Sequence, residues 1–263
     1  MVTGIELFKD HFRSHTDKFI LIGGTACDIA MAQMGLEFRA TRDLDIVLIV
    51  EALDAGFSDC FWEFVRKGRY KRWENSRGEK KFYRFIDPEN DAYPFMLELF
   101  ARKPDVLDIP ADCHLTPIPI DEAVSSLSAI LLNDDYYRFI LSGIPSEDGL
   151  QILDVEHLIP LKAKAHLDLL ERKDAGETID SREIKKHKND VFRLFQILSP
   201  ESSVSLPESI AQDVERFLSL VQQEPPDIKS LGIKNVSPEQ IAGRLKEIYH
   251  LYRHKRSGDK NSR

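Results

Sequence analysis

The feature that most constrains the fold is a run of sequence near the N-terminus, in which two apolar segments flank a glycine pair. Residues 19–24, FILIGG, have the pattern of a buried strand, and residues 44–50, LDIVLIV, are β-branched and almost continuously apolar. Between them, apolar residues at helical spacing predict a helix that begins at Thr25, a candidate N-cap, and ends at Gly35. Strands with such continuous apolar runs are covered on both faces, so we expect a sheet with helices packed against it.

The N-terminal half continues as a mixture of helix and strand. Residues 5–15 and 53–67 have the spacing of amphipathic helices. The segments 80–86 and 93–101 predict the two strands of a hairpin, because the turn-forming sequence DPENDA separates them. Residues 117–142 fit either an extended segment or the start of a helix, and the sequence leaves this choice open.

The C-terminal half has the pattern of a helical domain. Its periodicity predicts helices over 154–174, 181–198, 207–222 and 237–254, with Asp154, Ser181 and Ser237 as N-caps. Pro160 predicts a local irregularity in the first of them. The sequence therefore predicts an α+β fold, in which residues 1–150 form a mixed α/β domain and residues 151–263 form a helical bundle.

Composition and charge exclude several classes of protein. The net charge is −8, so any nucleic-acid contact is expected in a local patch; 65–81 and 250–263 are candidates, although a solvated loop and a frayed end explain them more simply. No run approaches the roughly 20 apolar residues of a membrane span. The three cysteines are scattered without metal-binding spacing, which disfavours disulfides and zinc and favours a cytoplasmic protein.

Asp43 and Asp45 are the strongest candidates for chemistry. Because they lie two residues apart at the start of a strand, both carboxylates point to one face, where they repel unless a cation lies between them. Hard oxygen ligands suit Mg²⁺ or Mn²⁺. Gly23 and Gly24 allow a ligand to approach the backbone closely, and the following helix N-terminus offers donors to phosphate, with the Thr25 hydroxyl as a further ligand.

The segment GGTACDIAMAQMGLEFRATRDLDIVL, residues 23–48, resembles the signature of the polymerase-beta-type nucleotidyltransferases. Its R-x-T-x-D-x-D form is similar to the AbiEii/AbiGii toxin branch of that superfamily. The matching residues are Gly23, Gly24, Arg39, Thr41, Asp43 and Asp45. The resemblance implies a nucleotidyltransferase-type mixed sheet, a bound nucleoside triphosphate beside Arg39 and Thr41, and two metal ions at the aspartates.

The same resemblance implies a third carboxylate from a neighbouring strand. Glu98, in the apolar run FMLELF, is the candidate, and it shares a strand face with Met96 and Phe100. A lone acid on such a face is costly unless it is solvated or coordinated. The alternative is a glutamate on an edge strand that faces water.

A second resemblance lies in the helical half. LIPLKAKAHLDLLERK followed by KKHKNDVFRL is similar to the K-x-x-A … R … D-x-x-x-L helices of the toxin family. It implies that Lys162 neutralises triphosphate charge, and that Asp190 orients this lysine or binds the nucleotide, in a helical domain that closes over the cleft. An ordinary surface charge pattern is the alternative. Arg172, Lys186 and His187 are weaker candidates.

The predicted function is transfer of a nucleoside monophosphate from a triphosphate to a hydroxyl group, with Mg²⁺ or Mn²⁺ held by Asp43, Asp45 and Glu98. The resemblance implies a tRNA or other RNA acceptor, a toxin–antitoxin or phage-defence setting and a cognate antitoxin. Two alternatives remain. One is a nucleotide-binding regulatory or interaction module without turnover; the other is transfer to a small molecule such as an aminoglycoside antibiotic.

Overall fold

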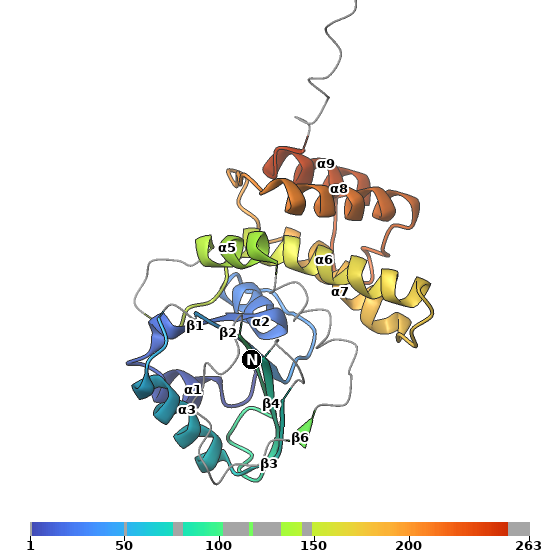
Figure 1. The fold of residues 1–263 in the computed structure, drawn as a ribbon. Helices are drawn as coiled ribbons and strands as arrows, with labels where there is room; N and C mark the ends of the chain where they lie inside the picture. The colour runs from blue at the N-terminus through green and yellow to red at the C-terminus, as the bar shows by residue number, and fades with distance from the viewer. Residues whose placement is uncertain are drawn as a thin grey trace, which may run out of the picture.

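The computed structural model describes residues 2–49, 52–75, 81–101, 116–117, 133–143 and 149–251. Within these ranges, the chain is an α+β structure with one mixed sheet and helices on both of its faces (Figure 1). The strands are β1 (Phe19–Ile22), β2 (Asp43–Leu48), β3 (Tyr70–Asn75), β4 (Lys81–Pro88), β5 (Met96–Ala101) and the two-residue β6 (Thr116–Pro117). The helices are α1 (Ile5–His11), α2 (Gly23–Gln33), α3 (Ala55–Gly68), α5 (Asp134–Ser142), α6 (Val155–Asp174), α7 (Ser181–Phe195), α8 (Glu208–Gln223) and α9 (Pro238–Ile248).

The strands follow the order β1-β2-β5-β4-β3-β6 across the sheet. β2 and β5 are parallel, whereas β1 pairs with β2, and β4 with both β5 and β3, in antiparallel fashion. The hairpin predicted over 80–86 and 93–101 is confirmed as the pair β4–β5. In this order β5 lies inside the sheet, between β2 and β4, which decides the surroundings of Glu98.

The two faces of the sheet pack against different layers. Leu44 and Ile46 of β2 belong to an apolar cluster with α1 and α3, whereas Val47 belongs to a second cluster with α5–α9. Because side chains alternate along a strand, Asp43 and Asp45 lie on the same face as Val47. Both aspartates are therefore directed toward the helical half of the molecule.

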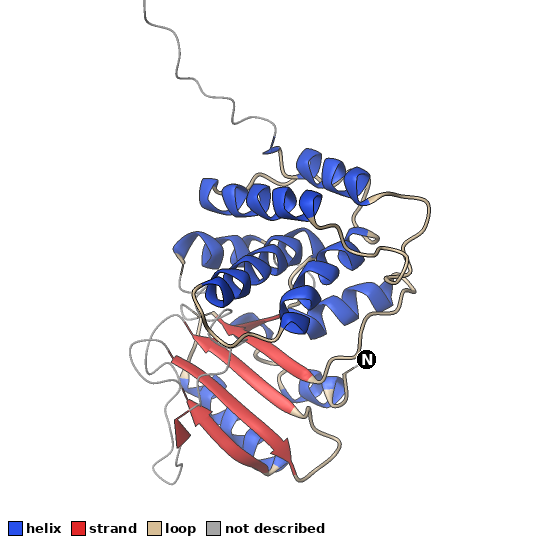
Figure 2. Cartoon of the chain, turned by 90° about the vertical axis from the view of Figure 1, so that its right-hand side faces the viewer, coloured by secondary structure: helices blue, strands red, loops and turns tan. Residues whose placement is uncertain are grey.

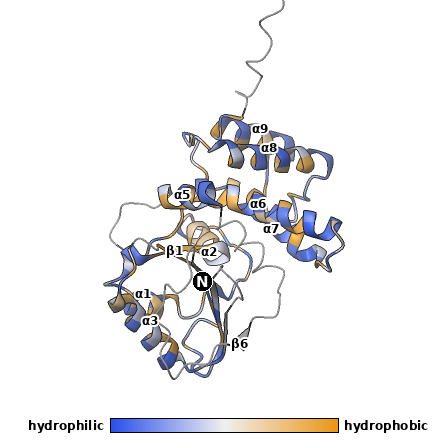
Figure 3. Cartoon of the chain, viewed as in Figure 1, coloured by the Kyte–Doolittle hydropathy of each residue, from blue (hydrophilic) through white to orange (hydrophobic). Residues whose placement is uncertain are grey.

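The helical half and the sheet share one apolar core. The second cluster joins Ile20 and Ile22 of β1 and Met31 of α2 to residues of α5–α9. Figure 2 shows the sheet below a stack of helices, and Figure 3 shows apolar and polar stripes alternating along these helices. α5 packs against α6 and α8, so this helix lies with the C-terminal helices although it precedes residue 150. The division of the chain at residue 150 stays a prediction.

Two helices of the C-terminal half begin where the sequence predicts. The side chain of Asp154 accepts a hydrogen bond from the backbone N–H of His157 and caps α6, which continues through Pro160 to Asp174. Ser237 caps α9 in a reciprocal capping box with Gln240. Local sequence signals were sufficient here, because a cap acts within a single turn.

Two predicted caps are wrong. α7 is capped by Asp180, whose carboxylate accepts from the backbone N–H of Arg182, and Ser181 is its first helical residue. α2 begins at Gly23, so Thr25 lies inside the first turn and does not cap the helix. Both helices therefore begin earlier in the sequence than the predicted caps, Ser181 and Thr25, indicate.

The basic segment 65–81 contains strand β3 as well as the end of α3. Tyr70, at the start of this strand, is buried, and its hydroxyl donates to the carbonyl of Pro94 over 2.7 Å. The ambiguous segment 117–142 ends in α5, while its residues 118–132 and the tail residues 252–263 lie outside the described residues. In the described ranges, the helices are too short or too polar to cross a membrane.

Candidate active site

A cavity of about 360 Å³ lies where the sheet meets α6 and α7. Strands β2 and β5, with residues 40–42 before β2, form one wall; α6 and α7, with Arg39, which contacts Asp190 of α7, form the other. The structure brings most of the sequence-predicted site residues to this cavity: Gly23, Gly24, Arg39, Thr41, Asp43, Asp45, Glu98 and Lys162. Its volume is in the range of small-molecule sites in proteins.

Three carboxylates meet on the sheet wall. Asp43 and Asp45 occupy one face of β2, and Asp45 is the direct cross-strand neighbour of Glu98 in β5. Burial, and after it the charge of Asp45, raises the pKa of Asp43; the same two causes raise the pKa of Glu98 well above its usual range. The sheet wall therefore concentrates negative charge that its surroundings compensate only in part.

Glu98 has a buried partner that sequence reasoning missed. The glutamate is 8% exposed on an interior strand, so the alternative of an edge-strand glutamate facing water is wrong. Its Oε1 accepts from Nε of Arg84 over 2.9 Å and lies 2.8 Å from Nη2 of the same side chain. Arg84 stands opposite Glu98 on β4 and is itself buried. The available signal was a charged residue inside the apolar run FYRFI.

At Gly23 and Gly24, a larger residue would clash with nearby side chains of the protein. Gly23 has a φ of +69°, and a Cβ there would lie 1.6 Å from Oδ2 of Asp45. A Cβ on Gly24 would lie 2.6 Å from the hydroxyl of Thr41. The backbone N–H of Gly24 donates to Oδ2 of Asp45 over 3.3 Å. The backbone N–H of Gly24, which the sequence predicts to bind phosphate, thus contacts Asp45. Phosphate binding at Gly23 and Gly24 stays a prediction.

Three of the sequence candidates, Thr25, Arg172 and Asp190, do not line the cavity. Thr25 is completely buried, and its hydroxyl donates to the backbone carbonyl of Asp43 over 2.6 Å. The structure therefore gives Thr25 the role of fixing the start of β2 against α2, not that of a hydroxyl ligand. Arg172 contacts Glu177 over 2.7 Å near the end of α6 and does not line the cavity.

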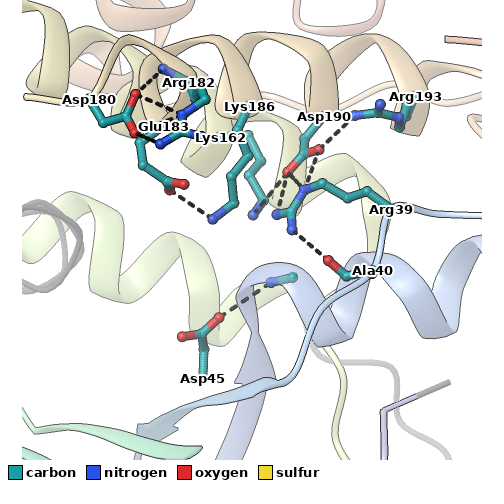
Figure 4. A network of polar contacts seen from close by, with 11 residues as sticks. Arg39, Ala40, Asp45, Lys162, Asp180, Arg182, Glu183, Lys186, Asp190 and Arg193 are labelled. Atoms are coloured by element: carbon teal, nitrogen blue, oxygen red, sulfur yellow. Dashed lines mark hydrogen bonds and ion pairs between the residues drawn. The ribbon is translucent and has the colours of Figure 1, made fainter.

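Asp190 is the centre of a cationic cluster across from the carboxylates (Figure 4). It is fully buried and accepts from Nε and Nη2 of Arg39 over 3.0 and 2.9 Å. Nη1 of Arg193 donates to it over 3.2 Å, and Nζ of Lys162 lies 3.6 Å away. Asp190 therefore orients Lys162 and ties Arg39, in the connector before β2, to helix α7. Direct contact of Asp190 with a nucleotide stays a prediction.

Helix α7 contributes two further cavity residues that the sequence ranked low. Lys186 contacts Glu183 over 2.8 Å. Nδ1 of His187 is buried without a hydrogen-bond partner among the described residues, and burial together with the charge of Lys162 lowers the pKa of this histidine well below its usual value. Both residues lie one helical turn before Asp190, and residues three or four apart share a helix face. This spacing was the sequence signal for their position beside the cavity.

The chemistry of the lining suits a ligand that carries both signs of charge. Among the described residues, no three His, Cys, Asp or Glu side chains form a group that could hold a metal ion as they stand. A scan against protein-family models and a search of curated proteins both returned no match to this chain. The geometry of the cavity and the resemblance of residues 23–48 to nucleotidyltransferases are therefore the two indications of function.

Proposed function

We propose that this protein is a metal-dependent nucleotidyltransferase that moves a nucleoside monophosphate from a triphosphate to a hydroxyl acceptor. The observation that carries the proposal is the pairing of opposite walls in one cavity: Asp43, Asp45 and Glu98 on the sheet side, and Arg39, Lys162 and Lys186 on the other. A magnesium–triphosphate complex presents positive and negative charge side by side. It therefore matches both walls at once.

Asp43 and Asp45 fit a divalent cation. Their carboxylates share a strand face at the cavity, where burial, and after it the charge of Asp45, raises the pKa of Asp43; a cation between the two carboxylates would offset their repulsion. Bound Mg²⁺ would supply charge neutralisation at the phosphates and activation of the attacking hydroxyl. The residues around it orient the substrate, so catalysis depends mainly on positioning and electrostatics.

Lys162 and Arg39 fit the phosphate groups. Asp190 holds both side chains at the cavity, so a bound phosphate would meet cations that are already oriented. In the transfer, the acceptor oxygen bonds to the α-phosphorus, and the bond from this phosphorus to the β-bridging oxygen breaks. Pyrophosphate leaves, and the hydroxyl proton passes to solvent.

The acceptor we propose is a hydroxyl group of RNA, with tRNA as the first to test. Support comes from the resemblance to the AbiEii/AbiGii branch, which also supports a role in a toxin–antitoxin or phage-defence system with a cognate antitoxin in the cytoplasm. Transfer to a small hydroxyl compound and nucleotide binding without turnover use the same cavity. The experiment below separates the three.

The test is to incubate the purified protein with Mg²⁺, each α-labelled triphosphate and total tRNA. Labelled RNA supports the proposal. In a parallel incubation with an added small hydroxyl compound, label on that compound alone would show that the acceptor is a small molecule, as in the aminoglycoside alternative. Binding of a triphosphate without transfer to any acceptor indicates a regulatory module and contradicts the enzymatic assignment.

The decisive variant is Asp45→Asn, which keeps the size of the side chain but removes the charge. Loss of a metal-binding carboxylate should reduce transfer by roughly 100-fold or more, because even outer-shell changes at metal sites cost up to about that factor. Asp59→Asn, an exposed aspartate on α3, is the matched control and should leave transfer unchanged. If Asp45→Asn keeps more than about a tenth of the activity, the metal-site assignment is wrong.

A further inference from the structure

We infer that His187 is a phosphate-binding residue, which donates a hydrogen bond from Nε2 to an oxygen of the bound triphosphate and does so as a neutral imidazole. The inference rests on the proposed function and deepens it, because the phosphate site then combines a neutral donor with the cations Arg39 and Lys162. The proposed function by itself gives His187 no part.

The two nitrogens of the His187 ring have different surroundings. His187 lines the cavity, and its Nδ1 is buried without a hydrogen-bond partner among the described residues. Nε2 also has no partner in those ranges, but this nitrogen is not buried. The cavity therefore reaches the ring on the side of Nε2.

These surroundings favour one position for the ring proton. A neutral imidazole has one N–H donor, and its other nitrogen can only accept a hydrogen bond. In protein interiors, an unpartnered N–H group is rarer than an unpartnered acceptor. The proton of His187 is therefore expected on Nε2, where the cavity can supply an acceptor, and the bare nitrogen on the buried side.

Positive charge around His187 keeps the imidazole neutral. Burial, and after it the charge of Lys162, lowers the pKa of His187 well below its usual value, and Lys186, Arg39 and His166 act in the same direction. Protonation would also place a second N–H on the buried Nδ1, which has no acceptor among the described residues. Both effects oppose the charged form.

The acidic residues of α7 on either side of His187 are engaged by cations. Glu183, one turn before it, contacts Lys186 over 2.8 Å, and Asp190, one turn after it, accepts from Arg39 over 3.0 Å. The imidazole therefore faces the cavity without an acceptor from its own helix. Across the cavity lie the three carboxylates of the sheet wall, Asp43, Asp45 and Glu98.

The surroundings of Nε2 favour a phosphate oxygen as its acceptor. Lys162 and Arg39, which fit the phosphates in the proposed function, are both among the charges that act on His187. An anion bound by these cations therefore lies beside the imidazole. A hydrogen bond to an ionised oxygen is stronger than one between neutral groups, and a neutral donor adds it without increasing the repulsion among the cations.

The test measures the binding of inorganic tripolyphosphate and of a nucleoside triphosphate to the full-length protein, by calorimetry with Mg²⁺. His187→Ala removes the donor, and the Kd for both ligands should rise roughly tenfold. His187→Gln places an amide N–H near the position of Nε2, and its Kd values should stay within about threefold of wild type. His15→Ala is the control, because His15 lies between α1 and β1, away from the cavity, and should change neither Kd.

The pH dependence tests the neutral state of the ring. The ratio of the wild-type Kd to the His187→Gln Kd should stay constant from about pH 6 to about pH 8, on both sides of the usual histidine pKa. Protons taken up by the ligand or by Asp43 cancel in this ratio, because both proteins share them. Wild-type binding that strengthens at the lower pH relative to His187→Gln would show a protonated His187 and overturn the neutral donor.

Two further results would contradict the role of the donor. Thermal unfolding shows whether each variant is folded, and His187→Leu, which keeps bulk without a donor, replaces His187→Ala if that variant is not. A His187→Gln variant that binds as weakly as His187→Ala would show that the ring, not its N–H, matters. Unchanged Kd values in His187→Ala or His187→Leu would overturn the inference outright.

The two ligands separate this inference from the proposed function. Weaker binding of the nucleoside triphosphate alone, with tripolyphosphate unaffected, would place the contact at the sugar or base and overturn the inference, while leaving the transferase proposal intact. Tripolyphosphate binding as expected, without nucleotidyl transfer, would support the inference and contradict the proposed reaction. A wild-type protein that binds neither ligand would overturn both.

Discussion

The two walls of the cavity are both built around buried ion pairs, but their charge balance is opposite. On the sheet wall, the carboxylates of Asp43, Asp45 and Glu98 lie beside the buried guanidinium of Arg84, which contacts Glu98. On the helical side, the buried carboxylate of Asp190 is surrounded by three cations. These are Arg39, Lys162 and Arg193.

This difference shows how a fold can prepare a site for a ligand with two kinds of charge. Burial, and after it the charge of Asp45, raises the pKa of Asp43, whereas burial, and after it the charge of Lys162, lowers the pKa of His187, so each wall carries charge of one sign. A cation on the sheet wall and phosphates on the helical wall would compensate both. Substitutions in one wall should therefore have effects that differ from those in the other.

The largest effect is expected at the centre of the helical wall. Asp190→Asn leaves Arg39, Lys162 and Arg193 without their shared carboxylate, and breaking such a buried ion pair should destabilise the protein by about 3–5 kcal/mol. Denaturant unfolding measures this loss. The control is Glu63→Gln, which breaks the exposed pair of Glu63 with Lys67 and should leave the free energy of unfolding almost unchanged. Equal effects of the two variants would show that the Asp190 cluster is not a structural centre.

A second large effect is expected where the sheet wall meets the glycine pair. Gly23→Ala adds a Cβ 1.6 Å from Oδ2 of Asp45 at a residue with a φ of +69°. Gly35→Ala is the matched control, because Gly35 has a φ of +70° and nothing within 4 Å of its Cβ position.

Gly35→Ala should cost only the backbone strain, roughly 1–2 kcal/mol. Gly23→Ala should cost more and should also displace Asp45, so its Mn²⁺ affinity should fall. Denaturant unfolding and Mn²⁺ titration measure the two effects. If both variants lose the same stability and Mn²⁺ binding is intact, glycine at position 23 is needed only for its positive φ and not for the placement of Asp45.

A smaller effect is expected for the phosphate contacts of the helical wall. Lys162→Ala removes a cation from the cavity, while Asp190 keeps Arg39 and Arg193, so the fold should persist. The Kd for a nucleoside triphosphate should rise roughly tenfold, or about 1.4 kcal/mol. Calorimetry measures it. Lys164→Ala is the control, since Lys164 contacts Asp213 away from the cavity and should not change the Kd.

The smallest effect is a pH dependence of the sheet wall. Because burial and the charge of Asp45 raise the pKa of Asp43, protons compete with Mn²⁺ for this carboxylate at a higher pH than for an ordinary aspartate, whose pKa is about 4. Mn²⁺ affinity should therefore fall as the pH decreases through the raised pKa.

In the metal-free protein, the same shift acts on stability. The folded state binds this proton more tightly than the unfolded chain, so the contribution of Asp43 is present at low pH and is lost as the pH rises through the folded-state pKa. Asp43→Asn should remove both dependences. An unchanged pH profile in that variant would place the titrating group elsewhere.

Much of the site followed from local sequence patterns. The two-residue repeat of a strand placed Asp43 and Asp45 on one face; the apolar run around Glu98 predicted a strand, and the family resemblance implied that this strand is a neighbour of the aspartates. The resemblance to nucleotidyltransferases added Lys162 from another part of the chain, and this residue lines the same cavity. The positions of these residues agree with the structure because backbone periodicity or a short motif determines them, whereas their roles stay predictions.

Other features depended on contacts that no local pattern encodes. Ser181 resembled a cap, but Asp180 begins the helix. Thr25 resembled a phosphate ligand, but its hydroxyl fixes the start of β2. A polar side chain can satisfy the same hydrogen bond with several partners, and the sequence alone does not distinguish among them.

The sequence by itself determined an α+β chain, with paired aspartates at the start of a strand, a glycine pair before a helix and a helical C-terminal half. Only the tertiary structure decided which charges meet: Arg84 with Glu98 across the sheet, and Arg39 with Asp190 across 151 positions of the chain. The reason is physical. Periodicity depends on the backbone and extends over a few residues, whereas the balance of buried charge depends on which elements pack together.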